Sequence, residues 1–262
     1  MSIQKSGRLE GKVAVVTGAS KGIGQAIAVR FAREGARAVA AARSLDDLAD
    51  TAALGDGRIV TQQCDVQQGS QVKALIDRAT TEFGALDVLV NNAGVGMQDL
   101  LVNTTEEDWD TTMNTNVKGT FFGLKYAIPA MSAGGSIINI GSTCSFTGER
   151  TSGAYVTSKG AVLMLTKNAA AETAHLGIRV NVICPGFTDT PMARIYFEET
   201  MGSADKADDF IRTFAPLTGM IPTEDIAGVA LFLASEDARS MTGASLVVDG
   251  GLLASWDHIA TT

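Results

Sequence analysis

The sequence predicts an α/β fold, a doubly wound sheet of seven parallel strands with helices on both faces. Short apolar runs that suit buried parallel strands alternate with longer segments of helical periodicity along the chain. The first run leads directly through a glycine-rich turn into a helix, and such alternation places helices on both faces of a sheet. No composition break interrupts the pattern, which predicts one domain over residues 1–262 with its core at 9–251.

The expected elements follow from the apolar runs and their boundaries. Strands are expected at 12–17, 38–42, 58–63, 86–90, 137–140, 178–184 and 244–248. Helices are expected from the first glycine turn to Gly35, and at 72–83, 105–131, 154–176 and 222–235. Asn116 is unusual inside a helix, because its side chain competes with the backbone for hydrogen bonds. It is interpreted either as an exposed asparagine or as a local distortion that frees a carbonyl for an ordered water.

Composition limits the classes of function. The chain has 262 residues, 45% of them hydrophobic, which is enough for a large core. A net charge of −8 argues against nucleic acid or an anionic membrane as a partner. Residues 1–10 contain no apolar stretch of the length of a signal peptide or membrane span, so a cytoplasmic protein is expected. The three scattered cysteines predict neither disulfides nor a metal site.

The first turn has the composition of a phosphate-binding loop. Residues 17–24 read Thr-Gly-Ala-Ser-Lys-Gly-Ile-Gly between a strand and a helix, where absent side chains and free helical N–H groups suit a pyrophosphate. The same segment also matches a Gly-x-Ser-x-Gly nucleophile elbow centred on Ser20. That hydrolase alternative needs a downstream histidine, and only His258 could serve, because His175 falls inside a helix.

The end of the second strand favours a phosphorylated cofactor. Ala42 stands where a carboxylate would bind an adenosine ribose hydroxyl, and Arg43 follows it. Arg43 and Lys21 would suit a 2′-phosphate, which favours NADP(H) over NAD(H); the alternative is two solvated surface cations. Asp65, after the third strand, could accept a hydrogen bond from an adenine amino group.

A tyrosine and a lysine four residues apart form the central feature of the chain. Tyr155 and Lys159 share one face of the expected helix 154–176, and Ser142 follows the fifth strand. An ammonium near a phenol is expected to lower the phenol pKa, which would equip Tyr155 for proton transfer. By itself such a pair is also typical of a solvated helix face.

With these pieces in order, the chain resembles the short-chain dehydrogenase/reductase family over residues 9–251. The resemblance rests on the following residues: Thr17–Gly24, Asp65, Asn91–Gly94, Asn116, Ser142, Tyr155, Lys159, Pro185, Gly186 and Val248–Gly251. It implies a Rossmann-like sheet of order 3-2-1-4-5-6-7. It implies Tyr155 as general acid or base, Ser142 as the group that polarises the substrate oxygen, and Lys159 as the ligand of the nicotinamide ribose. The Asn116 carbonyl would hold a water that relays protons from Lys159.

The resemblance also implies the binding residues. For the cofactor they are Gly18, Ser20, Lys21, Gly22, Ile23, Gly24, Arg43, Asp65, Val66, Asn92, Ala93, Gly94, Tyr155, Lys159, Pro185, Gly186, Thr188 and Thr190. Residues 191–219 show no clean periodicity and would form a mobile lid over the substrate. The substrate pocket would be largely apolar and involve Met97, Ser142, Cys144, Phe146, Tyr155, Met192 and Tyr196. Alternatively, the apolar side chains pack against the body or another subunit.

The expected function is an NADP(H)-dependent oxidoreductase that reduces a ketone or oxidises a secondary alcohol. Alternatives are a 3-oxoacyl-carrier-protein reductase, which the lack of an evident basic patch disfavours, and an NAD-dependent alcohol, steroid or sugar dehydrogenase. A catalytically silent dinucleotide sensor is the non-enzyme alternative. The apolar helices 105–131 and 154–176 would pair between subunits, with a homotetramer expected first and a dimer second. No use is assigned to the tail 252–262.

Overall fold

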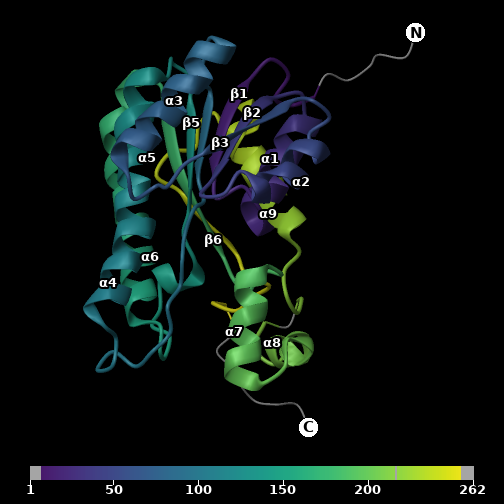
Figure 1. The fold of residues 1–262 in the computed structure, drawn as a ribbon, viewed down its shortest axis with the longest axis vertical. Helices are drawn as coiled ribbons and strands as arrows, with labels where there is room; N and C mark the ends of the chain where they lie inside the picture. The colour runs from purple at the N-terminus through teal and green to yellow at the C-terminus, as the bar shows by residue number, and fades with distance from the viewer. Residues whose placement is uncertain (1–6, 216, 255–262) are drawn as a thin grey trace.

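A computed structural model describes residues 7–215 and 217–254 (Figure 1). Its centre is one seven-stranded sheet of order β3-β2-β1-β4-β5-β6-β7, and every neighbouring pair is parallel. The strands are β1 (Val13–Thr17), β2 (Arg37–Ala42), β3 (Ile59–Gln63), β4 (Val88–Asn91), β5 (Ser136–Ile140), β6 (Arg179–Pro185) and β7 (Ser245–Val248). The predicted fold class and strand order are confirmed, and strand bounds differ from the expected ones by one or two residues.

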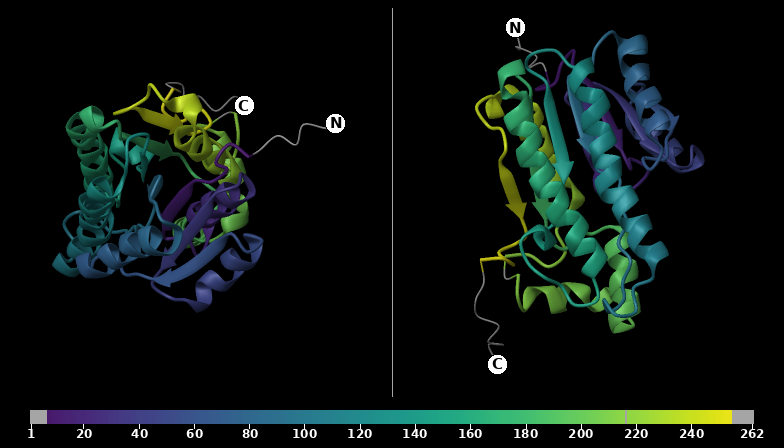
Figure 2. Two further views of the ribbon diagram at one scale, coloured as in Figure 1. Left: turned by 90° about the horizontal axis from the view of Figure 1, so that it is seen from above. Right: turned by 90° about the vertical axis from the view of Figure 1, so that its left-hand side faces the viewer.

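Helices cover both faces of this sheet, as Figure 2 shows from two further sides. One face carries α1 (Gly22–Arg33) and α9 (Thr223–Ala234), and the other carries α3 (Gly69–Phe83), α5 (Gly119–Ala127) and α6 (Gly153–Thr173). The short α2 (Ala49–Leu54) lies near α1 and β3. No helix in the described part of the chain is both long and apolar enough to cross a membrane.

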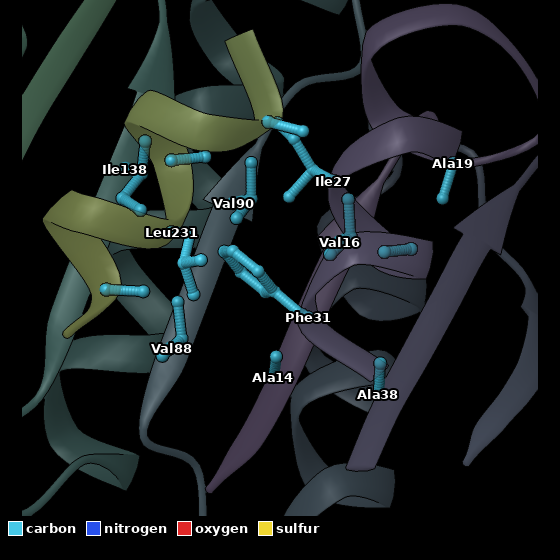
Figure 3. Packing of buried hydrophobic residues seen from close by; sticks show 14 of the residues in the cluster. Ala14, Val16, Ala19, Ile27, Phe31, Ala38, Val88, Val90, Ile138 and Leu231 are labelled. Atoms are coloured by element: carbon cyan, nitrogen blue, oxygen red, sulfur yellow. The ribbon is translucent and has the colours of Figure 1, made fainter. Parts of the chain in front are cut away.

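Successive residues of β1 point alternately into the two hydrophobic cores, one on each face of the sheet. Ala14 and Val16 of β1 belong to the cluster beneath α1 and α9, whereas Val13 and Val15 belong to the cluster on the opposite face. Figure 3 shows Phe31 of α1 and Leu231 of α9 packed over the strands in the first cluster. β1 is therefore buried on both of its faces, which explains why it reads as a continuous apolar run.

The prediction of a single continuous helix over 105–131 was wrong, because the segment is interrupted. It is divided into α4 (Glu106–Met113), a π-helical turn (Asn114–Lys118), α5 and a final 3₁₀ turn (Ile128–Ala130). The distortion expected at Asn116 is thus confirmed, and the exposed-asparagine alternative is excluded because Asn116 is only 1% exposed. Its side chain bonds to a neighbouring loop, and the wider π turn accommodates that contact.

The region 191–219, for which no clean periodicity was expected, contains two helices. They are α7 (Pro191–Met201) and α8 (Ala207–Arg212), and Figure 1 shows both projecting beyond the carboxyl end of the sheet. Phe197, Ala207, Ile211 and Ala215 form a separate buried cluster there. Phe187, from the end of β6, joins it with its ring centroid 5.2 Å from that of Phe197. The buried apolar residues of this region therefore pack among themselves, whereas others such as Ile195 are exposed. Residues 255–262 of the tail lie outside the described residues.

Candidate active site

The predicted site residues come together at one edge of the sheet. Gly18 follows β1, Asp65 follows β3, Asn92 follows β4, Ser142 follows β5 and Gly186 follows β6. Because all seven strands are parallel, these positions share the carboxyl edge. The strand order reverses between β1 and β4, and open α/β sheets bind ligands in the crevice at such a point.

The turn after β1 interlocks with the turn after β4. Gly18 has φ +63°, and a Cβ there would lie 2.7 Å from Ala93 Cα. The Asn92 side-chain amide donates to the carbonyl oxygens of Thr17 (3.0 Å) and Gly18 (2.9 Å). A Cβ at Gly24 would lie 2.3 Å from the Gly18 oxygen. Side chains at either glycine would push the two turns apart, which explains why glycine stands at both positions.

The first turn of α1 is suited to an anion. Lys21 is its extended N-cap residue and makes no side-chain cap hydrogen bond, and the first turn contains no acidic residue. The initial N–H groups of a helix lack intrahelical partners and lie at its positive end, so a pyrophosphate would fit beside Ser20 and Ile23. A Cβ at Gly22 would lie 3.1 Å from Thr190 Cγ2, which places the start of α7 against this turn.

The two predicted cations lie in different places. The exposed Arg43 lines a surface pocket together with Gln63 and Asp65, whereas Lys21 lines another with Asp189. The Asp65 carboxylate accepts from the Gln67 backbone N–H at 3.0 Å. Arg43 is therefore the cation that shares a pocket with the predicted adenine-binding residue.

Asn116 fastens the loop after β4 to α6. Its Oδ1 accepts from the Val95 N–H at 2.8 Å, and its Nδ2 donates to the Val95 oxygen and to Ser158 Oγ, both at 2.9 Å. Its backbone oxygen, expected to bind water, accepts from the Thr120 hydroxyl at 2.7 Å. A Cβ at Gly94 would lie 3.2 Å from Asn116 Oδ1.

Tyr155 and Lys159 meet Ser142 beside this loop. Lys159 Nζ lies 5.5 Å from the Tyr155 ring centroid and donates to the Ile140 oxygen at 2.9 Å. A Cβ at Gly94 would lie 3.6 Å from that Nζ, and a Cβ at Gly96 3.4 Å from Tyr155 Cδ2. The Ser142 hydroxyl accepts from the Cys144 N–H at 3.1 Å, which fixes it at the end of β5. The phenol, the ammonium and the serine hydroxyl thus converge on the crevice.

The expected lowering of the Tyr155 pKa was wrong for this structure. Burial raises the pKa of Tyr155 above its ordinary value, and a hydrogen bond with Ser142 opposes the shift. Burial also lowers the pKa of Lys159 to about 8. Desolvation disfavours the charged form of each group, and it is the largest cause of both pKa shifts.

The residues predicted for the substrate differ in their surroundings. Met97, Phe146 and Met192 are exposed, whereas Cys144 is buried and Tyr196 is partly buried. Tyr196 and Cys144 both donate to one carboxylate, that of Glu149, at 3.3 and 3.1 Å. Sequence reasoning missed Glu149, because an isolated acid in a polar loop carries no signal of its partners.

The structure also shows the surroundings of four further residues that were predicted to bind the cofactor. The Thr188 hydroxyl donates to the Gly186 oxygen at 3.1 Å, and the Thr190 hydroxyl caps α7 by accepting from the Ala193 N–H. Pro185 is buried at the end of β6. Val66 is buried, and a Cβ at Gly119 would lie 2.8 Å from its Cγ2.

The structure does not test the hydrolase alternative. Ser20 lies in the turn between β1 and α1, where both the phosphate-loop and the nucleophile-elbow interpretations place it. The histidine that the hydrolase alternative needs, His258, lies outside the part of the chain that the structure describes. No cluster of metal-binding side chains occurs among the described residues.

Known proteins resemble this chain along nearly its whole length. A family model described as enoyl-(acyl carrier protein) reductase matches residues 18–253. The 3-oxoacyl-[acyl-carrier-protein] reductase of Thermotoga maritima is 38% identical, over 94% of this chain and 99% of that protein. The NADP-dependent (R)-specific alcohol dehydrogenase of Lentilactobacillus kefiri is 37% identical, over 94% of this chain and 98% of that protein.

Solved structures agree with these matches. The ligand-free aldohexose dehydrogenase of Thermoplasma acidophilum has a TM-score of 0.88 and 36% identity, and the match covers 97% of this chain and 98% of that one. Levodione reductase has a TM-score of 0.91 and 31% identity, with 95% of this chain and all (100%) of that chain covered. The chain therefore belongs to the short-chain dehydrogenase/reductase family of oxidoreductases.

Proposed function

We propose that the protein is an NADP(H)-dependent oxidoreductase that reduces a ketone, or oxidises the corresponding secondary alcohol, with Tyr155 as general acid or base. The observation that carries the proposal is the convergence of Tyr155, Ser142 and Lys159 beside the interlocked turns at Gly18 and Asn92. A nicotinamide dinucleotide is the cofactor that the family implies. When bound, it supplies or accepts the hydride.

The residues present fit such a dinucleotide. The free N–H groups at the start of α1 would hold the pyrophosphate, and Gly18 and Gly24 leave the backbone accessible to it. Asp65 and Val66 would contact the adenine. Lys159 would bind the nicotinamide ribose. The remaining contacts would come from Ser20, Lys21, Gly22, Ile23, Asn92, Ala93, Gly94, Pro185, Gly186, Thr188 and Thr190.

Tyr155 is suited to donate a proton during reduction. Burial raises its pKa, so the phenol keeps its proton at neutral pH and can transfer it to the oxygen of the ketone as that oxygen gains negative charge. Ser142 would hold the same oxygen by a hydrogen bond. In the oxidative direction the phenolate is needed, and the charged form of Lys159 would stabilise it. Asn116 would act as a positioning residue, since it fixes the loop at Val95 against α6, and its carbonyl would hold the relay water.

Arg43 supports a preference for NADP(H). It follows Ala42, where a carboxylate would have bound an unphosphorylated ribose, and it shares a pocket with Asp65. A guanidinium can bind a phosphate through two parallel hydrogen bonds. The Lentilactobacillus relative is an NADP-dependent alcohol dehydrogenase, which agrees with this preference.

The proposal extends to the domain organisation, the location and the oligomeric state of the protein. We infer a single domain, a cytoplasmic location, and a mobile substrate lid formed by 191–219. We also infer a homotetramer, with a dimer second, because Phe121 of α5 and Met164 of α6 expose 43% and 61% of their surfaces.

Reduction of a 3-oxoacyl group on a carrier protein is the second candidate function, favoured by the Thermotoga relative. An acidic carrier would meet a chain whose own net charge is −8, which disfavours it.

A ketone panel tests the proposal. Purified protein is mixed with NADPH or NADH and with aliphatic, cyclic and sugar-derived ketones, and loss of reduced cofactor is followed by absorbance. Turnover of at least one ketone, faster with NADPH, is expected. Tight NADPH binding without turnover of any ketone would instead favour the catalytically silent dinucleotide sensor.

A further inference from the structure

Glu149 lies between the loop after β5 and helix α7. The Cys144 thiol donates to its Oε2 at 3.1 Å, and the Tyr196 hydroxyl donates to its Oε1 at 3.3 Å. Tyr196 is itself held in place, with its ring stacked on Phe187 at a centroid distance of 6.1 Å. Both oxygens of the carboxylate are therefore fixed by side chains from two different elements.

The carboxylate lies near the proposed reacting groups. Cys144, which bonds to Glu149, donates its backbone N–H to the Ser142 hydroxyl at 3.1 Å. The charge of Glu149 contributes to the raised pKa of Tyr155, which places the carboxylate within electrostatic range of the phenol. A ketone bound through its oxygen to Ser142 and Tyr155 would have one substituent directed toward Cys144, Glu149 and Tyr196.

Glu149 takes part in no ion pair within the described part of the chain. Its side chain is partly exposed. Each carboxylate oxygen accepts more than one hydrogen bond, so capacity remains beyond the bonds from Cys144 and Tyr196.

We propose that Glu149 determines substrate specificity, selecting ketones whose substituent carries a hydrogen-bond donor, such as a hydroxyl or ammonium group, and rejecting ketones that carry a carboxylate. This inference rests on the proposed function, because it concerns the substrate of the same site. A donor on the substituent would bind the free acceptor positions of Glu149. A substrate carboxylate would meet a like charge that forms no ion pair among the described residues, and like charges at close range repel strongly where water is partly excluded.

The test uses three small ketones of the same chain length. 5-Hydroxy-2-pentanone carries a donor, levulinate carries a carboxylate, and 2-pentanone carries neither. The measured quantity is the ratio of kcat/KM for 5-hydroxy-2-pentanone to that for levulinate, with NADPH as reductant. Wild-type protein should give a ratio of at least about 100, equivalent to about 2.7 kcal/mol of discrimination.

Three variants separate the charge from the local structure. Glu149→Gln removes the charge and should lower the ratio at least tenfold. Glu149→Asp keeps the charge and should retain a ratio within about threefold of wild type. Glu107→Gln, at an exposed position of α4 outside the proposed site, makes the same change in net charge elsewhere and should leave the ratio unaltered.

The outcomes distinguish the two proposals. A ratio in Glu149→Gln within twofold of wild type, with 2-pentanone still reduced, would overturn the role of Glu149 and leave the proposed function standing. A wild-type preference for levulinate would do the same. If the wild type reduces none of the three ketones nor any member of the wider panel, the proposed function fails and the specificity proposal fails with it.

Discussion

Asn116 offers a quantitative test of how the π turn supports the site. Replacing it by leucine, which has a similar size, removes the two hydrogen bonds to Val95 and the one to Ser158. Ser158 keeps its bond to the Tyr155 oxygen at 2.7 Å, but the Val95 N–H and oxygen lose the partners identified here. A buried group without a partner costs about 1–3 kcal/mol, and because Val95 is partly exposed we expect about 3 kcal/mol for both groups together.

That loss is large enough to measure by thermal unfolding. For a domain of this size, about 3 kcal/mol corresponds to a fall in Tm of roughly 6 to 12 °C. The freed loop would also let Gly94 and Gly96 move away from Lys159 and Tyr155, so kcat with a ketone should fall at least about 100-fold.

Asn114→Leu is the matched control for this substitution. Asn114 begins the same π turn but is partly exposed, so its replacement should change Tm by no more than about 1–2 °C. Equal Tm values and equal turnover in the two variants would refute the reasoning about Asn116.

Three further outcomes follow from the site. In fluorescence titrations, Arg43→Ala should raise the Kd for NADPH at least tenfold more than the Kd for NADH. Equal increases in the two Kd values would contradict the assignment of Arg43 to the 2′-phosphate. Gly18→Ala should weaken NADPH binding and lower Tm by several degrees more than the control Gly84→Ala. Both glycines have positive φ, but a Cβ at Gly84 would have no atom within 4 Å. Equal effects of the two substitutions would contradict the close approach of Gly18 to Ala93. The pKa of Lys159 is about 8 against 10.5 for an ordinary lysine, so the unfolded chain binds more protons between these values. Stability relative to Lys159→Met should therefore rise by about 2 kcal/mol from pH 7 to pH 9.5 in urea unfolding, and a flat or falling difference would contradict the lowered pKa.

The sheet was predictable because its central strands are buried on both faces. Runs such as Val13–Val16 are apolar throughout, and the turns between elements carry glycine or small polar residues. The distortion at Asn116 was also predictable as a local conflict. Its partners were not, because Val95 is 21 residues away and meets Asn116 only in the folded chain.

The helices beyond the sheet were harder to predict for a physical reason. In α7 and α8 the aromatic rings pack against one another and against Phe187, not along one stripe facing the sheet, so no regular period results. The predicted sign of the Tyr155 pKa shift was wrong. The prediction rested on the spacing of Tyr155 and Lys159 along the helix, whereas the burial that raises the pKa depends on the whole folded site. Glu149 is the corresponding case for specificity, since its partner Tyr196 lies 47 residues away, on α7.

The central claim is that Tyr155 transfers the proton, and Tyr155→Phe tests it most directly. The substitution removes the hydroxyl and retains the ring beside Gly96. NADPH binding, measured by fluorescence titration, should stay within about threefold of wild type, while single-turnover reduction of the best ketone falls at least about 1,000-fold, since acid catalysis and substrate positioning are lost together. Turnover within tenfold of wild type at unchanged NADPH affinity would contradict the account.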